Sequence, residues 1–218
     1  MLMNYWGGYT IPTIGVWDTF DEIDFESLPK QFCLKCTHDS GGLCICRDKS
    51  QFDYATAKEN INKFLKHNYY WHAREWPYKN VKPRILCEQY MENVEIGGLR
   101  DYKFYCFNGK VLYLYISDGL EDHSTARISF VTPDWKPAPF SRKDYTQHTV
   151  LPEKPKTLSE MIEIAERLSK GHPFLRVDLY EVENRIYFSE FTFFPCSGFM
   201  PFSQDEWDLK LGEKIELY

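Results

Sequence analysis

The sequence predicts an α+β fold in which short antiparallel β-hairpins alternate with helices. Several pairs of short segments are rich in aromatic and aliphatic residues and are joined by tight connectors, which is typical of hairpins. Two longer segments instead carry apolar residues at helical spacing or begin and end with helix-capping residues. Because neighbouring strands are linked by turns, we expect mostly antiparallel sheets and not a doubly wound parallel sheet.

The strands and helices follow from local patterns along the chain. Strands are expected over residues 31–36, 43–47, 84–91, 101–107, 111–116, 174–180 and 186–194. Asn108-Gly109 suits a type I′ turn and marks the clearest hairpin. Residues 68–82 are expected to form an irregular aromatic connector, and the proline-containing stretch 118–155 to be rich in loops.

Three segments have helical signals. Residues 53–67 place Ala57, Ile61, Phe64 and Leu65 on one face. A second helix is expected to begin at Thr157 or Ser159, to continue through Lys170 and to stop at Gly171. A last helix is expected to open with a variant of the capping box at residues 203–206.

Size and composition exclude several classes of protein. The chain has 218 residues, enough for one domain with two lobes, and a net charge of −6, which disfavours general affinity for nucleic acid or anionic membranes. No apolar run approaches the roughly 18 residues that span a bilayer. The start of the chain has neither a basic region nor a long apolar segment, so we expect no signal peptide, no membrane insertion and a cytoplasmic location.

The cysteines allow two interpretations. There are seven, and an odd number without a secretion signal favours reduced thiols. Cys33, Cys36, Cys44 and Cys46 could bind zinc. Both pairs lie in strand-like stretches, however, and cysteine is also a common small core residue, which is the interpretation we favour.

The most informative pattern is Arg176-Val-Asp178 followed by Glu190-Phe-Thr192 on two apolar strands. With a three-residue connector, Asp178 would lie opposite Glu190 and Arg176 opposite Thr192. Facing carboxylates repel, and a divalent cation such as Mg²⁺ is the simplest group to offset that repulsion. A two-residue turn at 183–184 would instead send Asp178 and Glu190 to opposite faces, and a solvated hairpin with scattered charges is the plain alternative.

Three further features could contribute to a nucleotide site. Lys35 precedes the loop Ser40-Gly41-Gly42, where small residues allow backbone N–H groups to approach phosphate. Glu88 ends a strand where it could accept a hydrogen bond from an exocyclic amine, and Lys103 shares a strand face with Asp101. Taken singly, these features are also typical of a hairpin turn, a solvated glutamate and a surface ion pair.

In this order, the features resemble the ATP-grasp superfamily, and more closely its TupA-like branch, which is associated with teichuronopeptide and capsule polymers of the bacterial surface. The resemblance covers about residues 13 to 218. It is carried by residues 28–41, 74–79, 83–90, 101–110, 173–180, 189–193 and 197–203.

The resemblance implies two α+β lobes with largely antiparallel sheets that hold ATP, an N-terminal lobe over about 25–87 with the phosphate loop and a C-terminal lobe over 88–218 with the metal site. It implies ATP-binding roles for Lys35, Ser40, Gly41, Gly42, Glu88, the main chain near Tyr90, Glu92 or Glu95, and Lys103. It implies Asp178 and Glu190 as Mg²⁺ ligands, with Thr192 where the superfamily often has Asn, and Arg176 and Lys103 as catalytic residues.

The expected activity is that of an ATP-dependent carboxylate–amine ligase that forms an acyl phosphate and releases ADP. The substrates would be a small-molecule or saccharide carboxylate and an amine, with possible partners in a surface-polysaccharide pathway. A kinase on the same fold and a non-catalytic nucleotide-binding partner are alternatives. Such proteins usually carry a further N-terminal region, which we expect to be absent here.

Residues proposed for substrate binding are Arg74, Trp76, His123, Arg127 and His148. For the histidines and tryptophans, packing or surface placement is the favoured alternative.

Overall fold

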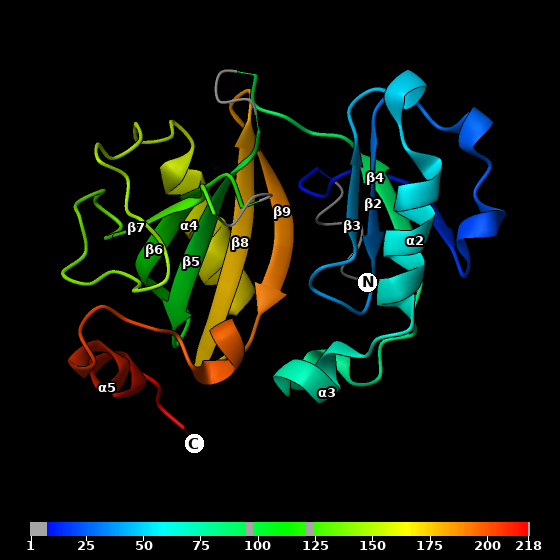
Figure 1. Cartoon of the computed structure of the whole chain (residues 1–218). Coiled ribbons are helices and arrows are strands. Elements are labelled where there is room, and N and C mark those ends of the chain that lie inside the picture. The colour runs from blue at the N-terminus through cyan, green and yellow to red at the C-terminus, as the bar shows by residue number, and fades with distance from the viewer. Residues whose placement is uncertain (1–7, 95–97, 121–123, 218) are drawn as a thin grey trace. The chain divides into compact units, whose positions relative to one another are not determined.

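A computed structural model describes residues 8–94, 98–120 and 124–217 of the chain. The chain divides into two compact units (Figure 1). The small unit is Ile11–Tyr90, and the large unit combines Met1–Thr10 with Met91–Tyr218. Each unit has its own sheet and hydrophobic core.

The small unit contains a four-stranded antiparallel sheet in the order β1-β4-β2-β3. Its strands are β1 (Thr13–Trp17), β2 (Phe32–Cys36), β3 (Leu43–Cys46) and β4 (Ile85–Gln89), and its helices are α2 (Tyr54–Leu65) and the short α3 (Tyr69–Ala73). The 3₁₀ turns are η1 (Phe20–Glu22), η2 (Phe25–Ser27), η3 (Lys49–Gln51) and η4 (Trp76–Tyr78).

Helix α2 covers one face of this sheet because its apolar stripe meets the inward side chains of β2. Asp53 caps the helix by accepting from the Thr56 N–H at 3.0 Å. Ala57 and Ile61 then pack with Phe32 and Leu34, all of which are buried. Lys35 alternates with these buried residues along β2 and therefore lies on the face opposite to α2.

The same alternation separates the clustered cysteines. Cys36 and Cys46 belong to the core beneath α2, and Cys44 packs against it. Cys33, one position out of step, lies on the opposite face of β2. The four thiols therefore do not converge on one ion, and all are free of disulfides.

The large unit contains a five-stranded antiparallel sheet in the order β7-β6-β5-β8-β9. Its strands are β5 (Arg100–Phe107), β6 (Lys110–Asp118), β7 (Arg127–Val131), β8 (Phe174–Val182) and β9 (Arg185–Thr192). Its helices are α4 (Leu158–Ser169) and α5 (Glu206–Gly212), with the 3₁₀ turn η5 (Pro195–Gly198) before α5.

Helix α4 lies along one face of this sheet (Figure 1) and buries it. Met161 and Ala165 of the helix pack against Phe104 and Val177 of the central strands, and all four are fully buried. The alternate residues of β5, β8 and β9 therefore point to the other face, where the polar and charged side chains gather.

The β8–β9 hairpin has the expected pairing, but its turn is shorter than expected and a bulge compensates for the difference. The turn has two residues, Glu183 and Asn184, both with positive φ (53° and 60°), as type I′ turns require. Such a turn alone would pair Asp178 with Ser189 and send Glu190 to the α4 face. A bulge next to Asp178 inserts one extra residue, so that Asp178 pairs with Glu190 and Arg176 with Thr192.

The α+β fold with antiparallel sheets is confirmed, as is the turn at Asn108-Gly109 (φ 50° and 77°). Three local expectations were wrong. Strand β7 forms inside the stretch expected to be loops, and α3 forms inside the aromatic connector. No capping box opens α5, which begins at Glu206, because the Ser203 hydroxyl instead accepts from the Ser141 N–H at 3.0 Å.

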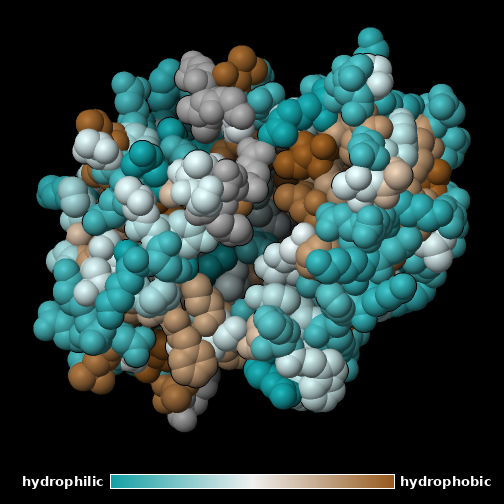
Figure 2. Space-filling view, in the orientation of Figure 1, coloured by the Kyte–Doolittle hydropathy of each residue, from teal (hydrophilic) through white to brown (hydrophobic). Residues whose placement is uncertain are grey.

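No described helix combines the length and apolar character needed to cross a membrane. The surface over α2 is mostly hydrophilic (Figure 2).

A half-buried ion pair within the sheet also contacts His148 in the loop after β7. Arg100 binds both oxygens of Asp118 at 2.7 and 2.9 Å, and His148 Nε2 lies 3.2 Å from the same carboxylate. Burial raises the pKa of Asp118, but the hydrogen bonds from His148 and Arg100 outweigh it and lower the pKa to about 2. His148 therefore has a structural position, as favoured from the sequence.

We expect Asp118→Asn to lower the free energy of unfolding by about 2–3 kcal/mol at neutral pH. Because the folded-state pKa lies below the unfolded value of about 3.9, this contribution is fully present above pH 4 and is lost as the pH falls toward 2. Urea unfolding of both proteins across that window measures it. Asp205→Asn, an exposed aspartate paired with Lys143, is the control. A stability difference that does not shrink between pH 4 and 2 would contradict the prediction.

Candidate functional site

The charged residues predicted on β5, β8 and β9 meet on the face of the large sheet that α4 leaves uncovered. Lys103 pairs with Asp178, which pairs with Glu190, in adjacent positions across the three strands. Lys103 Nζ lies 2.7 Å from Asp178 Oδ2 and 3.1 Å from Asp101 Oδ1. The five residues Asp101, Lys103, Arg176, Asp178 and Glu190 are called the charge cluster below.

Arg176 links Asp178 and Glu190, two of the three carboxylates of the cluster. Its Nε and Nη2 atoms each donate to Asp178 at 2.7 Å, and Nη2 also donates to Glu190 Oε1 at 3.2 Å. The guanidinium thus offsets the repulsion between the facing carboxylates. The sequence interpretation gave this role to a divalent metal ion. Its hydrogen bonds to the described residues use Nε and Nη2 and leave Nη1 unused.

Burial strengthens these interactions because few water molecules can screen them. Asp178 is 0% exposed. Burial raises its pKa, but Arg176 and Lys103 outweigh that effect and keep the pKa below its ordinary value. Burial would lower the pKa of Lys103, yet Asp101 and Asp178 raise it well above normal. Lys103 and Asp178 are therefore charged at neutral pH.

Glu190 differs from Asp178 in its surroundings. Its side chain is 48% exposed, and partial burial together with Asp178 raises its pKa. The Thr192 hydroxyl lies 3.4 Å from Glu190 Oε1 on the same strand face. Glu190 is thus the carboxylate of the cluster with oxygen available to a ligand.

The donor set fits Mg²⁺ that takes other ligands from phosphate and water. Mg²⁺ commonly binds through one or two carboxylates together with substrate phosphates. Asp178 and Glu190 place such oxygens side by side. Within the described residues, no group of three His, Cys, Asp or Glu side chains is arranged to hold a metal ion.

In the small unit, Lys35 and Glu88 meet on the sheet face opposite to α2. Lys35 Nζ lies 2.6 Å from Glu88 Oε2, and Glu88 is directly opposite Cys33 on the neighbouring strand. Tyr90 follows the end of β4, and its hydroxyl accepts from Arg47 Nε at 3.1 Å. Of the residues expected to bind phosphate and adenine, Lys35 and Glu88 therefore lie together on this face.

The Ser40–Gly42 loop has a local structure that the sequence interpretation did not consider. The Gly41 and Gly42 N–H groups both donate to Asp39 Oδ2, at 3.0 and 2.9 Å. A Cβ at Gly42 would come within 2.6 Å of Cys36 Sγ, and one at Gly41 within 2.9 Å of Phe64. Close packing thus explains both glycines, and a phosphate that uses these N–H groups must displace Asp39.

Other predicted residues lie apart from these groups. Glu92 is half-buried in the segment after β4 and belongs to the large unit. Arg74 and Trp76 lie on the surface of the small unit, and Arg127 lies at the start of β7. Glu95 and His123 lie outside the described residues.

Two neighbours of the cluster were not singled out from the sequence. The Tyr115 ring lies 5.8 Å from the Arg176 guanidinium carbon, and Tyr105 pairs with Arg176 across the ladder. The Tyr105 hydroxyl is buried without a hydrogen-bond partner among the described residues. Tyr105 lies two residues after Lys103 on β5, and Tyr115 pairs with Lys103 on β6. The two-residue alternation of strands could therefore have placed both tyrosines beside the cluster.

The comparisons with known proteins agree with this arrangement. A family model described as TupA-like ATPgrasp matches residues 3–216. No curated protein matches the chain significantly.

One solved ligase shares the fold at a TM-score of 0.50, and two further structures are similar at slightly lower scores. D-alanine–D-alanine ligase from Bacillus anthracis, solved with ATP, has a TM-score of 0.50 and 16% identity over 98% of this chain and 61% of its own. The ligase from Helicobacter pylori has a TM-score of 0.49 and 14% identity over 98% and 57%. D-cycloserine synthetase DcsG has a TM-score of 0.49 and 16% identity over 97% and 66%. The chain thus spans about three fifths of the length of the Bacillus anthracis ligase, and the likeness concerns the fold alone.

Proposed function

Because the chain belongs to the TupA-like ATP-grasp family, we propose that it is an ATP-dependent carboxylate–amine ligase. The observation that carries the proposal is the charge cluster, in which a buried lysine and a buried arginine share one sheet face with two carboxylates. Such a face can bind phosphate through its cations and a phosphate-bound Mg²⁺ through its carboxylates.

The proposed reaction has two steps. A substrate carboxylate oxygen attacks the γ-phosphorus of ATP, so that an O–P bond forms, the β–γ bond breaks and ADP leaves. An amine nitrogen then attacks the carbonyl carbon of the acyl phosphate, the C–N bond forms, phosphate leaves and the amine loses a proton. Catalysis of this kind depends mainly on positioning and on neutralising charge.

Lys103 and Arg176 have the catalytic role in this proposal. Both cations keep their charge despite burial, and Arg176 Nη1 is not used by any described residue. Fixed charges in a dry site stabilise a transition state more strongly than mobile charges in water. Mg²⁺, held by Asp178 and Glu190 with Thr192 nearby, would supply further positive charge at the phosphates.

The remaining residues bind the nucleotide in this proposal. Lys35 and the Ser40–Gly42 loop contact phosphates after Asp39 releases the two N–H groups. Glu88 and the main chain near Tyr90 recognise adenine, and Glu92 the ribose. These roles follow from the family resemblance, and the pairing of Lys35 with Glu88 supports placing both against one ligand.

The proposed substrates are a saccharide or amino-acid carboxylate and an amine used for a surface polysaccharide, in the cytoplasm. The chemistry of the cluster supports the reaction class, whereas the polymer and the location rest on the resemblance.

The test incubates the chain with Mg·ATP and a panel of uronic-acid sugars, with hydroxylamine or amino acids as the amine. We expect ADP, phosphate and a hydroxamate or amide, formed only when carboxylate and amine are both present. Hydroxylamine reports the acyl phosphate directly, because it attacks the carbonyl carbon and gives a hydroxamate as phosphate leaves. The hydroxamate forms a coloured complex with iron. AMP and pyrophosphate would exclude the mechanism, and a stable phosphorylated acceptor without amine would favour a kinase.

A further inference from the structure

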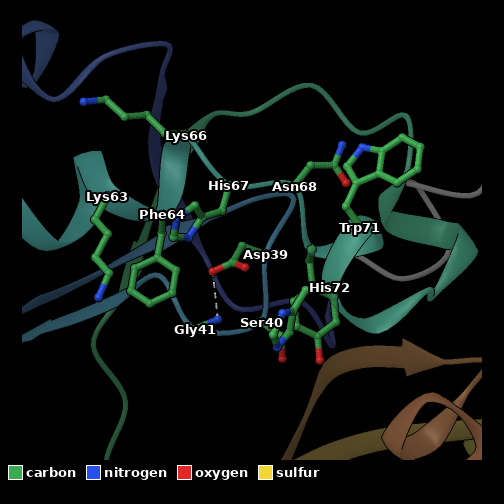
Figure 3. Close-up of a pocket in the computed structure, with 11 residues that line it drawn as sticks. Asp39, Ser40, Gly41, Lys63, Phe64, Lys66, His67, Asn68, Trp71 and His72 are labelled. Atoms are coloured by element: carbon green, nitrogen blue, oxygen red, sulfur yellow. Dashed lines mark hydrogen bonds between the residues drawn. The ribbon is translucent and has the colours of Figure 1, made fainter.

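A cavity lies in the small unit, at the tip of the β2–β3 loop. It has a volume of about 650 Å³. In Figure 3, Lys63 and Phe64 extend from α2 on one side, Trp71 and His72 from α3 on the other, and the Asp39–Gly41 loop lies between them. Lys66 and His67 complete the basic part of its wall.

Most residues of this pocket differ from those assigned to the nucleotide. Lys35 and Glu88 lie on the sheet face opposite to α2. The pocket wall is instead built from the last turn of α2 and from α3. Only Ser40 and Gly41 of the predicted phosphate loop contribute to it, so another ligand can be accommodated there.

The charges of the wall select an anion. Lys63, Lys66, His67 and His72 are all exposed at the surface, and none makes a side-chain ion pair with a described residue. Asp39 is the only acid among the lining residues, all of which are described, and its Oδ2 already accepts from Gly41 and Gly42. A basic pocket on a chain of net charge −6 concentrates anionic ligands locally.

The aromatic side chains select a ring. Trp71 is 63% exposed, and it is held by edge contact with Tyr70 and by the Arg74 guanidinium 5.3 Å from its ring centre. Trp71 therefore presents an exposed aromatic ring at the pocket. The apolar C–H face of a pyranose packs well on such a ring, while its hydroxyls accept from and donate to the Ser40 hydroxyl and the histidines.

We propose that this pocket binds an acidic sugar unit, with the pyranose ring on Trp71 and its anionic group held by Lys63 and Lys66. This anion is distinct from the carboxylate that reacts. Only the status of the saccharide as a substrate rests on the proposed function, since binding to the pocket requires neither ATP nor turnover.

The test is calorimetric titration of the whole chain, without ATP, with trigalacturonic acid, its neutral methyl ester and glucose 6-phosphate. We expect trigalacturonic acid to bind and the methyl ester to bind about tenfold more weakly or not at all, since loss of a charge-assisted hydrogen bond costs about 1.4 kcal/mol or more. Trp71→Ala and the double variant Lys63→Ala/Lys66→Ala should each weaken binding about tenfold. Binding of glucose 6-phosphate with equal affinity would identify a sugar phosphate as the source of the anion.

Matched controls separate the pocket from general surface effects. Phe199→Ala removes an exposed aromatic side chain (85%) outside the pocket, and Lys58→Ala removes a lysine of the same helix that pairs with Asp21. Both should bind like the unchanged chain. Absence of binding, equal binding of the methyl ester, or equal effects of control and pocket variants would each overturn the proposal. Ligase activity without saccharide binding at this pocket would overturn it alone and leave the proposed function standing.

Discussion

Asp178→Ala is expected to lower the free energy of unfolding by about 3–5 kcal/mol, the largest effect of any single change in the charge cluster. Asp178 is completely buried and accepts hydrogen bonds from Arg176 and Lys103 at 2.7 Å. Its removal leaves two buried cations with only Asp101 and the half-exposed Glu190 as partners. Such a loss is a large part of the 5–15 kcal/mol that typically stabilises a protein.

Urea unfolding checks this value, and two variants show whether the uncompensated charge is the cause. Glu190→Gln should cost no more than about 1 kcal/mol, because that carboxylate is half exposed and makes one longer contact with Arg176. Adding Arg176→Met to Asp178→Ala should recover part of the loss, since the Lys103–Asp101 pair remains. A small effect of Asp178→Ala, or no recovery in the double variant, would mean that the cluster does not stabilise the sheet as described.

The antiparallel hairpins were predictable because their signals are local. Asn108-Gly109 has the residues that a type I′ turn needs, and the turn forms with positive φ at both positions. Helix α2 begins where Asp53 provides a cap and follows an apolar stripe. These elements require no knowledge of distant residues.

The pairing of Asp178 with Glu190 was correct, although the connector expected to produce it was wrong. The turn has two residues, and the bulge beside Asp178 restores the register. A bulge depends on how both strands pack against the rest of the sheet, and nothing in the local sequence marks it. The outcome was therefore predictable only as one of two alternatives.

Tertiary contacts decided the features that the sequence did not predict. Strand β7 forms because Phe130 packs with Tyr105 and Phe140, which are distant in the chain. Arg176 bridges Asp178 and Glu190 because all three share a face, so the pair of carboxylates alone did not imply a metal. The Asp39 contact with Gly41 and Gly42, in contrast, follows a known preference of aspartate in turns and was available from the sequence.

Arg176→Lys is expected to lower kcat about 10²–10³-fold in the proposed ligase reaction while changing the KM for ATP little. Lysine keeps the charge but cannot bind Asp178 through two nitrogens and still direct a third toward phosphate, as the Nε, Nη2 and Nη1 atoms of Arg176 can. The loss would therefore fall on the transition state, where charge develops on the transferred phosphate.

Glu88→Gln is the matched comparison, because adenine contacts are similar in the ground and transition states. It should raise the KM for ATP with little change in kcat. Initial rates of ADP release with saturating carboxylate and amine separate the two parameters, and thermal melting confirms that each variant is folded. A kcat of Arg176→Lys within about threefold of the unchanged chain would remove Arg176 from the catalytic role. A loss confined to kcat in Glu88→Gln would remove that residue from nucleotide recognition and place it nearer the reacting groups.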